Sequence, residues 1–157
     1  KEEGGLGKAQ GAAATTTGGR AEDLFEAAER KDWATVASLV GKVDKPDSFT
    51  DTKGHTALHM CVMNGAPLDA VQGLLSKGAD PNKKQAYGNT SVHLAAGSPH
   101  GAAAAAVLDV LLDSGGDANK RNNAESTPLH VAVNARAHVS VFKSLLGHGA
   151  DPSKKVR

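Results

Sequence analysis

The order of apolar and polar positions along this chain contains a pattern that occurs three times. The first mark is a threonine followed by a small residue, an aliphatic residue and a histidine, at residues 56–59, 90–93 and 127–130. The second is a leucine pair followed after two residues by Gly-x-Asp, at residues 74–80, 111–117 and 145–151. Because both marks recur in the same phase, 34 to 37 residues apart, the chain is built from internal repeats.

The first mark predicts the start of a helix. Thr56, Thr90 and Thr127 suit the N-cap position, because a threonine hydroxyl can accept a hydrogen bond from a free backbone N–H of the first turn. Pro128 then falls on the first helical residue, where its missing N–H has no cost.

The second mark predicts a second helix in each unit. Pro67 is expected to open it, Val71, Leu74 and Leu75 form its apolar stripe, and Gly78 suits the left-handed residue that ends it. Two helices of about ten residues cannot bury both of their faces alone, so neighbouring units must stack. The glycine-rich stretches between units are expected to form turns and short hairpins, at residues 41–55, 76–89 and 113–126.

These segments resemble the ankyrin repeat. The resemblance rests on the TPLH run at residues 127–130, the leucine pairs and the GADPN run at residues 78–82, in three copies that cover residues 51–151. Residues 21–40 resemble a degenerate first repeat with a charged outer side, as an N-terminal cap needs. The resemblance implies an all-α solenoid of stacked helix pairs with short β-hairpin loops, in four repeats at about residues 21–50, 51–84, 85–121 and 122–157.

The chain departs from the family pattern at a few positions. Ala57 and Ser91 replace the usual proline, and Glu125 replaces the hairpin glycine, so we expect a distorted hairpin in the last unit. The third unit is three residues longer around residues 97–101, which predicts a loop that projects from the end opposite the hairpins.

Residues 1–20 differ in composition from the repeats. They consist mostly of Gly, Ala and Thr, with Leu6 as the single large apolar side chain. Such a tail cannot offset its ordering entropy by burial, so we expect it to be disordered unless a partner holds it.

Composition narrows the classes of function. The formal net charge of +1 gives no global field toward nucleic acid or membranes, and no apolar run reaches the roughly 20 residues of a membrane-spanning helix. Cys61 has no second cysteine to pair with, which favours a reducing, intracellular and cytoplasmic setting. No Gly-rich phosphate-binding motif and no nucleophile with a neighbouring base can be assembled. We therefore expect no enzyme and no cofactor.

His59, His93 and His130 recur in phase and invite a metal-site hypothesis. Stacking places them on different units about 10 Å apart, whereas zinc needs its nitrogen ligands about 2 Å from one ion. The resemblance instead implies that each histidine bonds the threonine hydroxyl and the backbone of a neighbouring hairpin. We expect no metal site, and we expect Cys61 to fill the core.

The resemblance implies a protein-binding surface at the hairpin tips and on the inner face of the first helices. Carried over by position, it comprises Thr52, Lys53, His55, Met63, Asn64, Ala86, Tyr87, Asn89, Asn123, Ala124, Ser126 and Asn134. Two alternatives remain open at this point. The chain could be a structural subunit of a permanent assembly, or a fragment of a larger ankyrin-repeat protein.

Basic pairs follow each Gly-x-Asp segment and predict a ladder of charge along one edge of the stack. We call these six residues the basic ladder: Lys83, Lys84, Lys120, Arg121, Lys154 and Lys155. The ladder is either a solvated face or a contact for an acidic segment of a partner.

Burial can be predicted from the same register. The residues expected in the core are Leu58, Leu74, Leu75, Val92, Leu94, Leu111, Leu112, Leu129 and Leu145. The outer surface of a terminal unit should carry charge, but in the second helix of the last unit Lys143 is the single charged residue among Val139, Val141, Phe142, Leu145 and Leu146. We therefore expect further residues or a partner chain to cover the C-terminal repeat.

Overall fold

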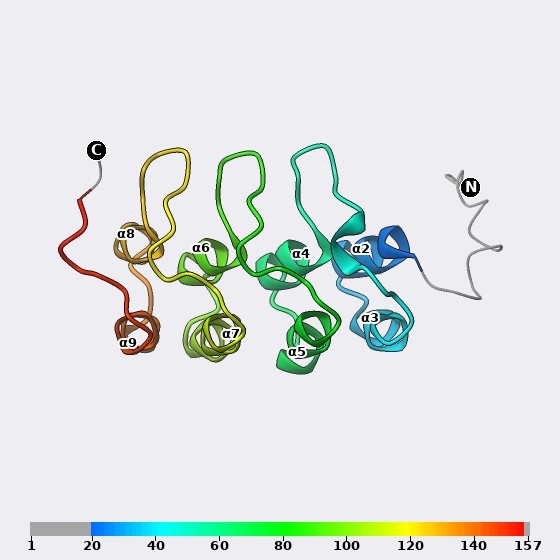
Figure 1. Ribbon diagram of the computed structural model, residues 1–157. Coiled ribbons are helices and arrows are strands. Elements are labelled where there is room, and N and C mark those ends of the chain that lie inside the picture. Colours follow the sequence, from blue (N-terminus) through cyan, green and yellow to red (C-terminus); the bar gives the residue numbers. More distant parts are fainter. Residues whose placement is uncertain (1–19, 156–157) are drawn as a thin grey trace.

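The computed structural model describes residues 20–155, which form eight α-helices and one short 3₁₀ helix, with no strand among them. The helices pair in chain order and the pairs stand in line, with the first helices in one row and the second helices in another (Figure 1). The pairs are α2 (Ala21–Glu29) with α3 (Trp33–Val40), α4 (Ala57–Met63) with α5 (Leu68–Ser76), α6 (Ser91–Ala96) with α7 (Ala102–Asp113), and α8 (Pro128–Asn134) with α9 (Val139–Gly147). The 3₁₀ helix η3 spans Pro46–Ser48. The four stacked helix pairs predicted from the sequence are confirmed.

The predicted N-caps are all present. Thr56 caps α4, and its hydroxyl accepts a hydrogen bond from the backbone N–H of His59. Thr90 and Thr127 cap α6 and α8 in the same way. Pro67 lies one residue earlier than expected: it is the N-cap of α5 rather than its first helical residue.

Glu125 does not distort the last hairpin, so that prediction is wrong. Gly54 and Gly88 hold φ near +79° and +78°, and Glu125 adopts φ of +62° at the equivalent position. Its N–H donates to the carbonyl of Asn122 over 2.9 Å, which closes the same turn that the two glycines close. A non-glycine residue in this conformation costs on the order of 1 kcal/mol, and the fixed turn imposes it.

The core runs through the junctions between units. Six of the nine expected residues are buried: Leu58, Leu74, Val92, Leu111, Leu112 and Leu145. Leu75, Leu94 and Leu129 are only partly buried, although they pack against the core. Leu129 is equivalent to the buried Leu58 and Val92 but belongs to the last helix pair of the described residues, so no other described pair covers it from outside. Leu75 lies in the last turn of α5.

Two asparagine side chains clamp one unit to the next. Asn82 donates from Nδ2 to the carbonyl of Gly115 (2.9 Å) and accepts at Oδ1 from the N–H of Asp117 (2.7 Å). Asn119 makes the same two bonds to the loop after α9, over 2.9 and 2.8 Å. Each clamp pairs one backbone donor and one acceptor, so it fixes the register of the stack.

The N-terminal unit carries charge on its outer side. Glu26, Glu29 and Arg30 are exposed, while Leu24 and Phe25 are buried against the stack. Arg20 precedes α2, and its side chain bonds Asp23 over 2.9 Å. The predictions made for residues 1–19 lie outside the described residues. None of the described helices is long and apolar enough to cross a membrane.

Deleting a buried side chain at a junction should be costly. We expect Leu111→Ala to lower the free energy of unfolding by about 2–5 kcal/mol, because the substitution removes buried methyl groups and leaves a cavity. Urea denaturation measures the loss. The exposed Leu146→Ala is the matched control and should change stability by less than about 1 kcal/mol. Equal effects of the two changes would show that the register is wrong.

Asp47 occupies the clamp position at the first junction, and an asparagine should serve better there. Its Oδ2 accepts from the N–H of Asp80 (2.7 Å), but its Oδ1 is buried without a hydrogen-bond partner among the described residues. Burial raises the pKa of this carboxyl group. In Asp47→Asn the amide can donate to Gly78, the equivalent of Gly115, as Asn82 does.

We expect Asp47→Asn to raise the free energy of unfolding by about 1 kcal/mol at neutral pH, the usual net worth of one hydrogen bond. Urea titration against the exposed control Asp44→Asn checks it. A loss of stability in Asp47→Asn would contradict the assigned clamp.

Candidate functional site

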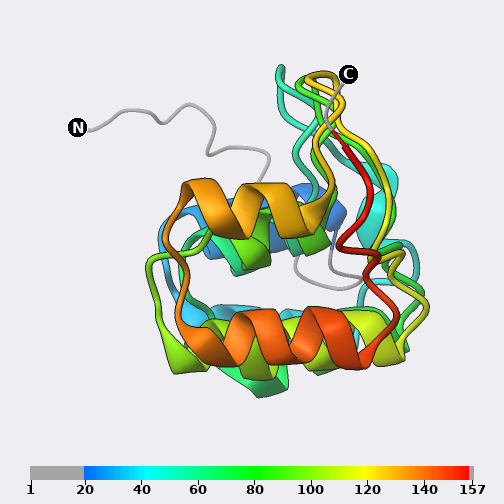
Figure 2. The same ribbon diagram turned by 90° about the vertical axis from the view of Figure 1, so that its left-hand side faces the viewer.

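Three hairpins project from the same side of the stack and present their tips in a row (Figures 1 and 2). Each is tied by the side chain of its first residue, which accepts two backbone N–H bonds. Asp51 accepts from Lys53 and His55 (2.9 and 2.8 Å). Gln85 and Asn122 bind the residues two and four positions further on in the same way. The tips are therefore held in fixed conformations from within.

Neighbouring hairpins are also joined to each other. The N–H of Ala86 donates to the carbonyl of Lys53 (2.8 Å), and the N–H of Asn123 donates to the carbonyl of Tyr87 (3.0 Å). Both peptide groups of Tyr87 are thus engaged, while its side chain is 61% exposed. A rigid backbone that presents a free aromatic ring is well suited to a protein contact.

The inner face of the first helices adds a second row of accessible side chains. Met63 ends α4 and is exposed, and Asn134 holds the equivalent exposed position at the end of α8. In the third unit this position is Gly97, where an added Cβ would lie 2.9 Å from a methyl group of Val131. The space for a side chain at the middle position is therefore taken by Val131 of the next unit, whereas Met63 and Asn134 are exposed.

Of the twelve predicted contact residues, eight are exposed: Thr52, Lys53, Met63, Ala86, Tyr87, Asn123, Ala124 and Asn134. His55 is buried, so its prediction as a contact residue is wrong. Its Nδ1 lies 2.9 Å from Asp51 Oδ2, and its ring meets that of His59 edge-on. The ring therefore stabilises its own hairpin through Asp51 and packs against the first helix of the unit through His59.

The remaining three residues are partly buried and serve the stack. Asn64 donates from Nδ2 to the carbonyl of Ala28 (3.0 Å), which ties α4 to the first unit. Asn89 accepts at Oδ1 from Asn122 Nδ2 (2.8 Å), and the carbonyl of Ser126 lies 3.1 Å from His93 Nε2. These bonds depend on the neighbouring unit, which a single segment of sequence does not show.

The basic ladder is less uniform than its spacing predicts. Lys83 Nζ donates to the carbonyl of Asp47 (3.2 Å). Arg121 donates from Nη1 to the carbonyls of Glu125 (2.6 Å) and Lys155 (2.9 Å). Lys120 and Lys154 are partly buried, whereas Lys84 and Lys155 are exposed. The exposed charge of the ladder is therefore concentrated at these last two lysines.

The phased histidines act in the stack. His59 Nδ1 accepts from the N–H of Thr56 (2.9 Å), so the proton sits on Nε2, which donates to the carbonyl of Lys83 (2.9 Å). Burial lowers the pKa of His59 to about 4 and also lowers that of His93. Both rings are thus neutral at physiological pH. Residues 20–155 contain no group of three metal-ligating side chains.

Cys61 lies in the core, and burial raises the pKa of its thiol to about 12. The thiol stays protonated at neutral pH, whereas a nucleophile needs the thiolate. Its position agrees with the core role expected from the sequence.

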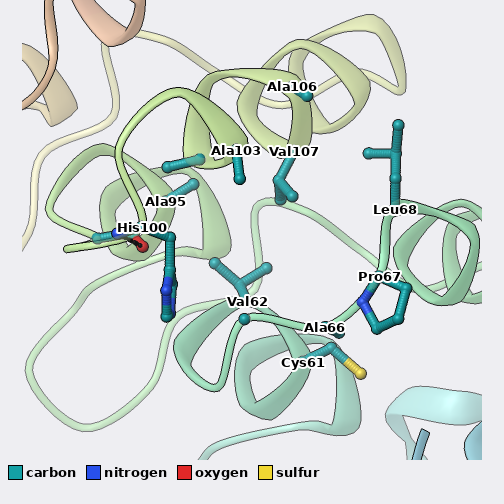
Figure 3. Close-up of a pocket in the computed structure, with 13 residues that line it drawn as sticks. Cys61, Val62, Ala66, Pro67, Leu68, Ala95, His100, Ala103, Ala106 and Val107 are labelled. Carbon is teal, nitrogen blue, oxygen red and sulfur yellow. Dashed lines mark hydrogen bonds between the residues drawn. The ribbon is translucent and has the colours of Figure 1, made fainter.

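A cavity of about 400 Å³ lies between the second and third units, and the sequence did not predict it. It opens between the α4–α5 loop, which contributes Gly65 and Pro67, and the start of α7, which contributes Ala103 and Val107 (Figure 3). His100 of the three-residue insertion lines it as well. The insertion and the alanine run at residues 102–106 were the available signals, because alanines leave space between packed helices.

The comparison with family models gives the class of protein. The model described as ankyrin repeats (3 copies) matches residues 24–109 and 61–156. These matches cover the four helix pairs, and the chain belongs to the ankyrin-repeat family. Proteins of this family are generally non-catalytic, and their repeats generally mediate protein–protein interaction.

One relative is the zinc finger CCCH domain-containing protein 56 of Arabidopsis thaliana. It is 38% identical over 91 residues, which cover 49% of this chain and 13% of that protein. The similarity therefore concerns a small part of the relative's length.

Acid should destabilise this stack through its buried histidines. The folded state keeps His59 neutral down to pH about 4, whereas an unfolded histidine takes up a proton near pH 6.5. The contribution of neutral His59 to the free energy of unfolding is therefore fully present above pH 6.5. As the pH falls from 6.5 toward 4, the free energy of unfolding decreases by on the order of 2–3 kcal/mol through His59. His148 acts in the opposite direction, because its bonds to Ser144 and Asp113 raise its pKa.

Urea titrations at several pH values between 7 and about 4 check this prediction. The difference between the unmodified chain and His59→Gln isolates the contribution of His59, and His59→Gln should show the shallower loss. Leu111→Ala is the control, because it lowers stability without removing a titrating group. Parallel pH profiles for the chain and His59→Gln would contradict the assignment.

Proposed function

We propose that this chain binds a partner protein through its hairpin tips and its concave helical face, without catalysing a reaction. The observation that carries the proposal is the row of three hairpin tips, each held by side-chain-to-backbone bonds and each joined to the next. A surface that is already ordered loses little conformational entropy on binding, so its contacts translate more fully into affinity.

Tyr87 is the proposed anchor of this surface. It stands on the central hairpin, and its ring is the most exposed large apolar side chain of the described residues. Tyrosine is enriched among residues that dominate binding energy, because it buries much area and can also hydrogen-bond. Met63 and Asn134 extend the contact along the first helices.

We further propose that the partner presents an acidic segment to the basic ladder. Lys84 and Lys155 carry this part of the proposal, because their side chains are exposed. Charges at the rim of an interface act mainly on the association rate and on its dependence on salt.

A second candidate is a structural subunit built permanently into a larger assembly. The observation that favours it is the exposure of Val133, Val139 and Leu146 on the last unit, since exposed apolar clusters mark interaction sites. The two candidate functions differ in the lifetime of the complex. A binding module releases its partner and can bind it again, whereas a structural subunit stays in the assembly.

The partner is first identified by crosslinking and mass spectrometry on native material. We then expect Tyr87→Ala to weaken binding of that partner by about 5- to 30-fold, the range of a residue worth 1–2 kcal/mol. The exposed Gln72→Ala on α5 is the control, because α5 belongs to the row of second helices. Unchanged affinity in Tyr87→Ala, with crosslinks confined to the second helices, would contradict the proposal.

The same assay tests the ladder. In the double variant Lys84→Ala and Lys155→Ala, binding should weaken and its dependence on ionic strength should flatten. An unchanged salt dependence would indicate that the basic ladder is a solvated face and does not contact the partner.

A further inference from the structure

The outer face of the last helix pair exposes large apolar side chains. Val133 of α8 is 60% exposed, and Val139 and Leu146 of α9 are 59% and 50% exposed. Figure 2 looks straight at this face, where α8 and α9 lie in front of the other helices. We call Val133, Val139, Lys143 and Leu146 the end face.

The three apolar positions of the end face are the ones that interior units use for stacking. Their equivalents in the third unit are all buried: Ala96 for Val133, Ala105 for Val139 and Leu112 for Leu146. In the third unit the α8–α9 pair covers these positions. The end face therefore continues an interface that is already established inside the stack, where the equivalent positions pack against helices.

Charge on the end face is the reverse of that at the preceding junction. On α7, Asp109 and Asp113 face the next unit, where His148 lies 3.9 and 2.8 Å from their oxygens. On α9 the equivalent of Asp109 is Lys143. Lys143 stands four residues after Val139 and three before Leu146, so the three share one side of the helix. An occupant of this face therefore meets a cation where the α7 face presents anions.

A regular further repeat and a second copy both fit this face less well. Ser153 replaces the clamping asparagine, and its hydroxyl donates to Asp151 Oδ1 of its own loop (2.6 Å). A following repeat would thus lack the two-bond clamp that Asn82 and Asn119 supply, and the first junction, where Asp47 keeps one of the two bonds, shows that a junction without the amide is formed but is less complete. Two end faces placed together would bring two Lys143 cations into one apolar interface with no carboxylate of that face to pair with them, which is unfavourable.

We propose that the end face docks an acidic amphipathic α-helix of another protein. The apolar stripe of that helix covers Val133, Val139 and Leu146, and its flanking carboxylates pair with Lys143. This docking site lies apart from the hairpin tips, so it can hold or fail independently of the binding proposed there. It names an occupant for the apolar cluster that favours the second candidate.

The test uses the whole 157-residue chain and two fluorescein-labelled peptides. One consists of repeated Leu-Glu-Glu-Leu blocks and the other of Leu-Lys-Lys-Leu blocks, so that both form helices with the same apolar stripe and opposite charge. Fluorescence anisotropy should show binding of the acidic peptide at least about tenfold tighter than that of the basic one. Lys143→Glu should reverse this order.

The variant Val139→Ser with Leu146→Ser should abolish binding of the acidic peptide. Gln72→Ala, which changes the position on α5 equivalent to Lys143, should leave binding unchanged. Urea titration shows whether each variant is folded, and if the double variant is not, the charge reversal in Lys143→Glu decides alone.

Three results would overturn the proposal. One is equal affinity for the two peptides, and another is an order that Lys143→Glu leaves unchanged. The third is a dimer in solution, measured by light scattering, that Val139→Ser with Leu146→Ser converts to a monomer, because the occupant would then be a second copy of this chain.

Discussion

The stacking of the units depends on the hydrogen bonds of two neutral, buried imidazole rings, those of His59 and His93. Nδ1 of each ring accepts from the threonine N–H at the start of its own helix, and Nε2 reaches a carbonyl in the loop that leads to the next unit. One side chain therefore starts a helix and positions the following hairpin. Protonation would place a donor opposite the threonine N–H, so the arrangement requires the neutral ring.

Each unit also presents groups that only its neighbour can satisfy. Asn82 binds a backbone carbonyl and an N–H of the next loop, and the hairpins exchange one bond at each junction. Stability in such a stack is a sum of units and junctions, so the two ends are the exceptional places. The N-terminal unit meets solvent with Glu26 and Glu29, whereas the C-terminal unit exposes Val139 and Leu146.

Local signals predicted the helix pairs and their caps, because the marks that specify them lie within a few residues of one another. The clamp at Asn82 and the burial of His55 could not be predicted in this way, since Asn82 bonds Gly115 and His55 lies against Gln85, and both of these partners belong to the next unit or its loop. Glu125 shows the same limit: its local preference opposes the left-handed turn, and the bonds of the surrounding hairpin override it. Exposure at the proposed site was predicted correctly for residues such as Tyr87, which is 61% exposed on the central hairpin.

The linear arrangement separates two surfaces that a globular domain of this size would have difficulty keeping apart. The hairpin tips run along the side of the stack, and the outer face of α8 and α9 closes one end of it (Figures 1 and 2). A partner on the tips and a partner on the end can therefore bind at the same time without overlap. The hairpin at residues 122–126 belongs to the same unit as α8, and its peptide groups are tied to those of the preceding hairpin. Because each tip is already held by bonds within its own hairpin, the two surfaces are expected to bind independently of each other.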